Sequence, residues 1–149
     1  MKQNIKNDSR GFSLIELIVV IAIVSVLIAV IAPQYTKYIT SARVITDIKN
    51  GGELATGIMT AIADPDYEND IYSDSEAGVR LVGGEEGNLP SVLTDLPQIQ
   101  YTGKGRNGVN LSDSLIWTAS WDVTDGEVHV YCRGVEVYPD ATEYSRLRE

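Results

Sequence analysis

Hydrophobic residues are concentrated in one stretch near the start of this 149-residue chain. From Phe12 to Ala32, 18 of 21 residues are apolar, and the other three are Ser13, Glu16 and Ser25. As a helix, this stretch would span roughly 31 Å, about the thickness of the hydrocarbon layer of a bilayer. Its Leu, Ile and Val residues favour insertion by roughly 4 to 8 kcal/mol, and the acid opposes it by about 3 kcal/mol. The pattern therefore predicts a membrane-spanning helix.

Beyond Ala32 the apolar residues become periodic. They recur every three or four positions, as on one face of a helix: Tyr35, Tyr38, Ile39, Ala42, Ile45, Ile48, Ala55, Ile58, Met59 and Ile62. Charged residues fall on the other faces: Lys37, Arg43, Asp47, Lys49 and Glu53. Asp64 precedes Pro65 and marks the expected end, since a residue before proline avoids the helical region. We predict one helix from about Phe12 to Ala63, whose second half packs on a domain.

Proline and glycine interrupt this helix. Pro33 removes a backbone hydrogen bond and clashes with the carbonyl of Ala29, so we expect a kink there. Gly51, Gly52 and Gly57 each cost about 1 kcal/mol relative to alanine in a helix interior. The glycines indicate either flexibility and close packing of another element, or tolerated defects, and both interpretations stay open.

The end of the chain alternates with a period of two, which is typical of half-buried strands. The predicted strands and weaker strand candidates are, in order, Gly78–Val82, Gln98–Thr102, Leu115–Val123, Glu127–Cys132 and Val135–Tyr138. Thr124-Asp125-Gly126 and the segment Gly103–Gly108 are interpreted as turns. One face of this antiparallel meander should cover the apolar stripe of the helix, which is an α+β arrangement.

Residues 64–100 are strongly acidic, with nine acidic residues and one basic residue. The spacing from Asp64 to Asp70 superficially suggests a calcium loop. However, Asn69 stands where an EF-hand needs glycine, and Ser75 stands where it needs glutamate. We therefore interpret the segment as a solvated acidic loop without a metal.

Charge and composition narrow the function. The chain has 12 basic and 21 acidic residues, a net charge of −9, whereas nucleic-acid binding needs a basic surface. A single cysteine, Cys132, excludes an intrachain disulfide, and one cysteine with one histidine cannot build the common zinc sites. Cys132 is interpreted as a small hydrophobe and His129 as a surface residue. We predict no cofactor, no metal and no catalytic residue.

The residues before the apolar run indicate its orientation. Residues 1–11 carry three basic residues and one acidic residue, so they should stay cytoplasmic while the C-terminal part is exported. A secretory signal peptide would need a cleavage site after the run, but around Ala29 and Ala32 the periodic pattern continues. A plain membrane anchor explains everything except Glu16, because an acid inside an apolar span needs a partner.

The sequence Gly11-Phe12-Ser13-Leu14-Ile15-Glu16, behind its short basic leader, resembles the prepilin signal of the type IV pilin family. Pro33 also falls where pilins commonly carry a helix-kinking proline. The resemblance implies cleavage between Gly11 and Phe12 by a prepilin peptidase, and N-methylation of Phe12. It further implies an inner-membrane assembly platform and polymerisation with other copies of the chain. Many pilins close their C-terminal region with a disulfide, which this chain cannot form.

Cleavage after Gly11 would give Phe12 a positive amine. Removing three basic residues and one acidic residue would leave 9 against 20, a net charge of −11. An unpaired amine and an unpaired carboxylate are both costly in apolar surroundings, and pairing relieves both costs. Glu16 lies one helical turn from Phe12 and can pair with its own amine or with that of a neighbouring subunit. The resemblance favours the neighbour, where the pair would set register, and the alternative is a hydrated acid at the membrane interface.

These observations predict four regions: a leader (1–11), a transmembrane and assembly helix (12–32), an amphipathic helix (33–63) and an exported head (64–149). The hypothesis is a structural, non-enzymatic subunit of a type IV pilus. It would be held in the cytoplasmic membrane and then assembled into an extracellular filament for adhesion, motility or surface colonisation. One alternative is a pseudopilin of a type II secretion or competence system. Another, from a different class, is a membrane-anchored exported enzyme or sensor.

Overall fold

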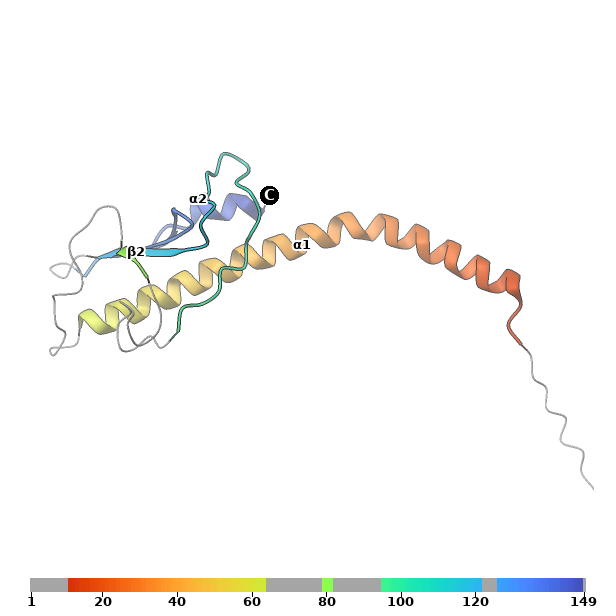
Figure 1. The fold of residues 1–149 in the computed structure, drawn as a ribbon, viewed down its shortest axis with the longest axis horizontal. Helices are drawn as coiled ribbons and strands as arrows, with labels where there is room; N and C mark the ends of the chain where they lie inside the picture. Colours follow the sequence, from red (N-terminus) through yellow and green to blue (C-terminus); the bar gives the residue numbers. More distant parts are fainter. Residues whose placement is uncertain (1–10, 64–78, 82–94, 122–125, 149) are drawn as a thin grey trace, which may run out of the picture. The chain divides into compact units, whose positions relative to one another are not determined.

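A computed structural model describes residues 11–63, 79–81, 95–121 and 126–148. The predicted leader up to residue 10, the acidic calcium-like spacing and Thr124-Asp125 lie outside these residues. In chain order the elements are helix α1 (Leu14–Ile62), strands β1 (Val79–Arg80), β2 (Trp117–Trp121), β3 (Val128–Cys132) and β4 (Val135–Tyr138), helix α2 (Thr142–Ser145) and the 3₁₀ helix η2 (Arg146–Arg148) (Figure 1). The chain forms two compact units, Met1–Thr36 and Lys37–Glu149. From here on the second unit is called the head, and it includes the second half of α1 as well as the predicted exported region 64–149.

Helix α1 confirms the long helix expected from the sequence, with both ends within two residues of the prediction. Ser13 is its N-cap, because the Ser13 carbonyl accepts a helical hydrogen bond from the backbone N–H of Leu17 at 3.2 Å. Pro33 lies inside the helix. The hydroxyl of Thr36 donates to the Pro33 carbonyl at 3.0 Å.

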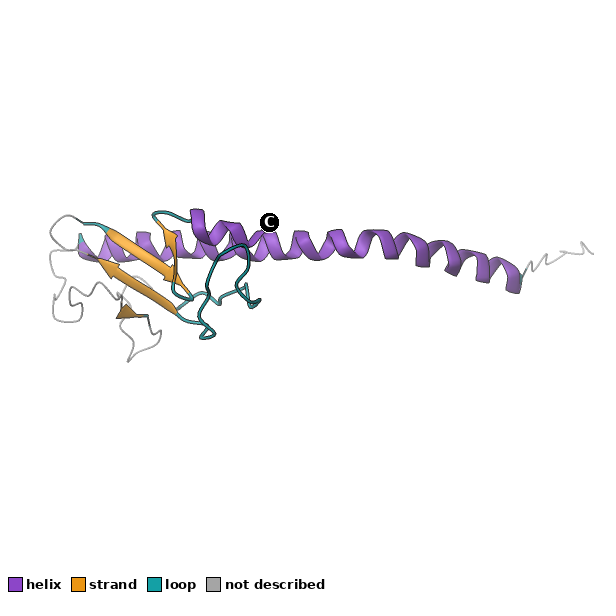
Figure 2. Ribbon diagram, turned by 90° about the horizontal axis from the view of Figure 1, so that it is seen from above, coloured by secondary structure: helices purple, strands orange, loops and turns teal. Residues whose placement is uncertain are grey.

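The strands form one antiparallel sheet in the order β1-β2-β3-β4 (Figure 2). Every second residue is buried along β2, β3 and β4, as the alternation predicted: Trp117, Ala119, Trp121, Val128, Val130, Cys132, Val135 and Val137. Leu115 was expected within β2, but it precedes the strand and is exposed. The β3–β4 hairpin turns at Arg133 and Gly134, with φ of 54° and 82°.

The core of the head lies between this sheet and the second half of α1, which confirms the α+β prediction. The inward face of α1 consists of Val44, Asp47, Gly51, Leu54, Ala55, Gly57, Ile58 and Ala61. Each large aliphatic side chain that is fully buried here contributes about 1.5 to 3 kcal/mol. Figure 1 shows β2 and α2 on the same side of the yellow part of α1.

The stripe on α1 that faces the core is shifted from the predicted one. Ala55 and Ile58 are buried as predicted, but four members of the predicted stripe are exposed: Tyr35, Tyr38, Ala42 and Ile45. Asp47, which was expected on a polar face, is completely buried. The shift has two physical reasons. The sheet lies so close to the helix that a small residue, Gly51, must face it. The burial of the Asp47 carboxylate is compensated by hydrogen bonds.

The strand suggested at Gln98–Thr102 does not form. The backbone N–H groups of Gln100 and Tyr101 donate to the carboxylate of Asp47, at 2.7 and 2.9 Å, rather than to a neighbouring strand. Buried backbone groups need a partner of some kind, and here a side chain supplies it. The predicted turn within Gly103–Gly108 is confirmed at Asn107 and Gly108.

The adjacent glycines of α1 have different explanations. A Cβ at Gly51 would lie 2.4 Å from Cγ2 of Val137 and 3.6 Å from the ring of Trp117, so only glycine allows this close packing. A Cβ at Gly52 would meet nothing within 4 Å. The close-packing interpretation therefore holds for Gly51, and the tolerated-defect interpretation holds for Gly52.

Candidate functional site

The residues predicted to be processed and assembled lie in the unit Met1–Thr36. Gly11 and Phe12 precede α1, and Phe12 is 85% exposed. Every Leu, Ile and Val side chain from Leu14 to Ile31 is exposed as well. The apolar part of α1 is not buried, and the helix is long and apolar enough to cross a membrane. Such a large exposed apolar surface marks a membrane or protein interface.

Glu16 lies in the first turn of α1, with its Oε2 3.5 Å from the backbone nitrogen of Ser13. The contact is one half of a capping box, the half in which the acid three residues beyond the N-cap reaches back to its N–H. A carboxylate is also favoured there by the helix dipole. The sequence reasoning missed this local role, although the Ser-x-x-Glu spacing is its signature.

The capping contact leaves the charge of Glu16 without a cationic partner among the described residues. Within the described part of the chain, no Lys, Arg or His side chain lies within 4 Å of its carboxylate. The Ser13 contact is long and solvent-exposed, so it holds the carboxylate weakly. The structure therefore presents an acid at the start of an uncovered apolar helix, where a cation from elsewhere can reach it.

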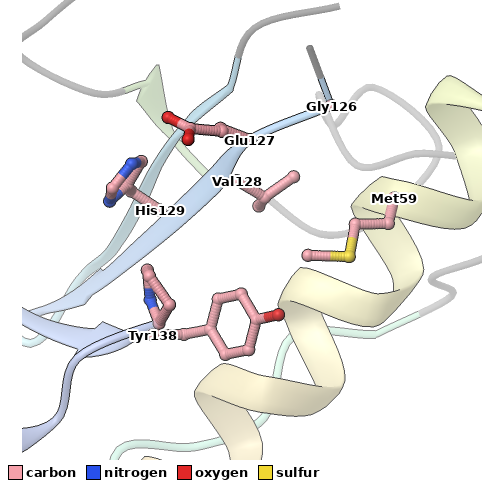
Figure 3. Close-up of a pocket in the computed structure, with 7 residues that line it drawn as sticks. Met59, Gly126, Glu127, Val128, His129 and Tyr138 are labelled. Atoms are coloured by element: carbon pink, nitrogen blue, oxygen red, sulfur yellow. The ribbon is translucent and has the colours of Figure 1, made fainter.

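A pocket of about 280 Å³ lies in the head between α1, β3 and β4. In Figure 3, Met59 and Val128 point toward each other across it, Tyr138 lies at its side, and Glu127 and His129 lie on the outer side of β3. Ligand sites are typically larger, from about 300 to 1,000 Å³, and have polar groups that converge on the ligand. The pocket residues named here give no nucleophile paired with a base.

His129 and Cys132, which could act in catalysis, each contact another side chain of the head. His129 is partly exposed, as predicted, and its Nδ1 lies 2.6 Å from Oε1 of Glu136 on the neighbouring strand. Cys132 is fully buried, with its Sγ 3.3 Å from the hydroxyl of Tyr144. Burial raises the pKa of the Cys132 thiol to about 12, which keeps it protonated and unreactive near neutral pH. Cys132 therefore packs as a small hydrophobe, as predicted.

Metal-ligating groups do not gather in the parts of the head that the structure describes, since no set of three His, Cys, Asp or Glu residues there could hold an ion. The exposed N-terminal segment of α1 thus remains as the strongest candidate for function.

The comparisons with known proteins bear on this segment. The model of the prokaryotic N-terminal methylation motif matches residues 6–32. A type IV major fimbrial protein FimA of Dichelobacter nodosus is 35% identical over 116 residues, covering 76% of this chain and 69% of the relative. Another FimA of that species is 35% identical over 126 residues, covering 72% and 76%. The chain belongs to the type IV pilin family.

Further relatives agree with this assignment. The type IV major alpha-pilin of Moraxella bovis is 32% identical over 108 residues, covering 68% of this pilin and 65% of the relative. One FimA match spans only 48% of the relative's length. No solved structure matches the chain significantly. The named relatives are structural fimbrial proteins, so the function of this pilin is that of a structural pilus subunit. The methylation motif includes Gly11, Phe12 and Glu16 and supports N-terminal processing.

Proposed function

We propose that this pilin is cut between Gly11 and Phe12 by a prepilin peptidase, methylated on Phe12, and polymerised with copies of itself into an extracellular filament. The observation that carries the proposal is the uncovered apolar helix, Leu14 to Ile31, directly behind a methylation motif. Before assembly this helix would lie in the cytoplasmic membrane, with residues 1–11 on the cytoplasmic side. An inner-membrane assembly platform would then move it from lipid into the filament.

Glu16 would supply the register of this assembly. Cleavage creates a positive amine on Phe12, and an ion pair with the Glu16 carboxylate of a neighbouring subunit would compensate both charges in apolar surroundings. The cost of releasing Glu16 from its own helix is small, because its contact with Ser13 is 3.5 Å long and exposed. Pro33 would permit a bend between the assembly segment and the rest of α1.

A second exposed apolar surface supports an interface that continues into the head. Tyr38, Ala42 and Ile45 are exposed at three- and four-residue spacing on α1, so they lie on one face of the helix. The same helix buries a different face against the sheet. We infer that the 33–63 region of the helix serves both the head and the filament, whereas the 12–32 region serves the filament alone.

Mass spectrometry of the N-terminus of the native pilin tests this proposal. The expected chain begins at Phe12 and carries one added methyl group, whereas a chain that retains residues 1–11 would contradict it. Gly11→Val should leave the leader attached, because residue 11 directly precedes the cleaved bond and a bulkier side chain there should prevent cleavage. Normal processing of that variant would place the cleavage elsewhere.

Imaging separates the pilus from its nearest alternative. Long extracellular fibres that contain this pilin support a pilus subunit, whereas short fibres confined to the cell envelope support a pseudopilin of a secretion or competence system. The relatives named as major fimbrial proteins favour the long fibre. A membrane-anchored enzyme or sensor would yield neither kind of fibre.

A further inference from the structure

A single buried carboxylate on α1 holds two parts of the head that are distant in sequence. Asp47 is fully buried, and its Oδ1 accepts the backbone N–H of Gln100 at 2.7 Å. Its Oδ2 accepts the backbone N–H of Tyr101 and the hydroxyl of Tyr144, both at 2.9 Å. Gln100 and Tyr101 belong to the segment 96–111, here called the loop. Tyr144 belongs to the C-terminal segment, Thr142–Arg148, formed by α2 and η2.

The loop and the C-terminal segment also bind each other directly. Arg106 donates from Nε to the carbonyl of Leu147 at 2.8 Å and from Nη2 to the same oxygen. The side-chain amide of Asn107 donates to the carbonyl of Arg146 at 2.8 Å. Carbonyl groups at the end of a helix lack partners within the helix, so the loop supplies the donors that the end of η2 requires.

The same loop is held from its other side by a buried cation. Arg133 is 4% exposed, and its Nη1 donates to the carbonyls of Tyr101 at 3.1 Å and Gly103 at 2.7 Å. Its Nε donates to the carbonyl of Ser112 at 2.8 Å. The loop therefore has an acidic anchor on the helix and a basic anchor in the β3–β4 turn. Of these two anchors, only the acidic one forms a hydrogen bond with the C-terminal segment among the described residues.

We propose that Asp47 acts as a latch that makes the loop and the C-terminal segment open and close as one cooperative unit. If either segment opens, the buried carboxylate loses donors that compensate its charge, and its remaining environment becomes less favourable. The other segment then opens more readily. This chain has a single cysteine and therefore no intrachain disulfide, and the C-terminal segment is joined to Asp47 and to the loop by hydrogen bonds.

Opening of the latch would change the surface of the head. Tyr144 and Leu147 are fully buried in the closed form, and they are the buried side chains of the C-terminal segment. Their release would expose apolar surface beside β4. The latch is independent of the proposed filament assembly, because it concerns contacts within one head.

Amide hydrogen exchange on the full chain in detergent micelles tests the coupling. Tyr144→Phe removes one hydroxyl from the C-terminal segment and leaves the loop sequence unchanged. We expect exchange at Gln100 and Tyr101 to rise about tenfold, together with exchange at Ser145 in the C-terminal segment, because loss of a hydrogen bond to a charged group favours local opening by at least that factor. Faster exchange confined to the C-terminal segment, or no change in either segment, would overturn the latch.

Two further variants sharpen the test. Asp47→Asn removes the charge and should raise exchange in both segments by more than Tyr144→Phe does. The control is Glu53→Gln, a carboxylate on the same helix that is 64% exposed and pairs with Lys49 at 3.4 Å, and it should change neither segment. Tyr144→Phe decides the question even if Asp47→Asn does not fold. Faster exchange of the loop in the Glu53→Gln control would also contradict the proposal.

Discussion

Asp47 and Arg133, the two buried charged residues of the described head, are linked through Tyr101. The Tyr101 N–H donates to the Asp47 carboxylate at 2.9 Å, and the Tyr101 carbonyl accepts from the Arg133 guanidinium at 3.1 Å. Backbone polar groups thus lie between an anion on the helix and a cation in the β3–β4 turn. The two charged side chains bind backbone groups of a segment that forms no strand. These hydrogen bonds offset the free-energy cost of burying the charges.

This arrangement predicts a large loss of stability on Asp47→Ala. Two backbone N–H groups and one phenol would lose their shared acceptor. Each buried donor left without an acceptor typically costs about 1 to 3 kcal/mol, so the total loss for the three donors should be at least about 3 kcal/mol. Urea unfolding of the full chain in detergent, followed by the fluorescence of Trp117 and Trp121, measures the change. Both tryptophans are buried in the head and report on its unfolding.

Glu53→Ala is the matched control for that experiment. Glu53 lies on the same helix and pairs with Lys49, but both side chains are largely exposed. Exposed helix pairs of this kind contribute about 0.3 to 0.5 kcal/mol. If Asp47→Ala cost no more than Glu53→Ala, the burial and hydrogen bonding of Asp47 would be unimportant for stability.

The neighbouring glycines of α1 predict effects of opposite sign. Gly51→Ala places a methyl group 2.4 Å from Cγ2 of Val137, so either the helix or β4 must move, at a cost of about 1 to 3 kcal/mol. Gly52→Ala meets nothing within 4 Å and should stabilise the helix by about 1 kcal/mol. The same urea unfolding assay checks both. Stabilisation by both substitutions would mean that the sheet does not approach Gly51 closely.

The buried thiol predicts how stability changes with alkaline pH. The pKa of Cys132 is raised by burial from 9.0 to about 12. Above pH 9 the unfolded chain therefore loses this proton while the folded chain keeps it. The stabilising effect is complete below pH 9 and declines as the pH rises toward 12, with a slope of at most about 1.4 kcal/mol per pH unit. Burial also raises the pKa of Tyr144, whose ordinary value is 10.0, which adds a decline of the same sign at higher pH.

Unfolding of the wild type and of Cys132→Ala at pH 8, 9 and 10 isolates the thiol. The wild type should lose stability between pH 9 and 10 more steeply than the variant, because only the wild type has a thiol to ionise. A reducing agent should leave the stability of both unchanged, since the chain cannot form an internal disulfide. Parallel curves for the two proteins would show that Cys132 is already solvated in the folded head.

The elements of the fold that sequence predicts well are those with strong periodicity. The alternation of Trp117, Ala119 and Trp121 fixes the inward face of β2, because adjacent residues of a strand point to opposite sides. The long helix is predicted from its apolar run and from the three- to four-residue spacing that follows it. The Gly11-to-Glu16 motif identifies the family without any structure. These signals are local, so a single sequence contains them in full.

The sequence-based prediction fails where contacts between distant residues determine which side chains are buried and which segments form strands. Asp47 follows Val44 by three positions and precedes Gly51 by four, so it occupies the core stripe, but its charge argued for a polar face until its partners at Gln100 and Tyr101 were known. Those partners lie more than fifty residues away, where the same contact prevents the expected strand. The periodicity also continued through Tyr38, although that side chain is 72% exposed. Periodicity shows that a face is apolar, but not what covers it.

Glu16 gives the prediction that separates a structural role from an assembly role. Glu16→Ala removes both the capping contact with Ser13 and the negative charge, whereas Glu16→Gln keeps an oxygen that can accept the Ser13 N–H and removes only the charge. If pairing with the Phe12 amine of a neighbour sets register, both variants should insert in the membrane and be processed, and both should yield far fewer filaments than the wild type. The measurement is the filament yield at equal amounts of membrane-inserted, processed pilin.

Glu16→Ala and Glu16→Gln together separate the loss of the helix cap from the loss of the charge. Loss of an N-terminal helix contact alone costs about 0.5 to 2 kcal/mol, and Glu16→Gln avoids most of that cost. Normal yield from Glu16→Gln with low yield from Glu16→Ala would assign Glu16 to helix capping and would contradict the ion pair. Glu16→Asp should give an intermediate yield, because it keeps the charge but shortens the side chain by one methylene group. A graded loss in the order Asp, Gln, Ala therefore requires both roles, with the charge as the larger part.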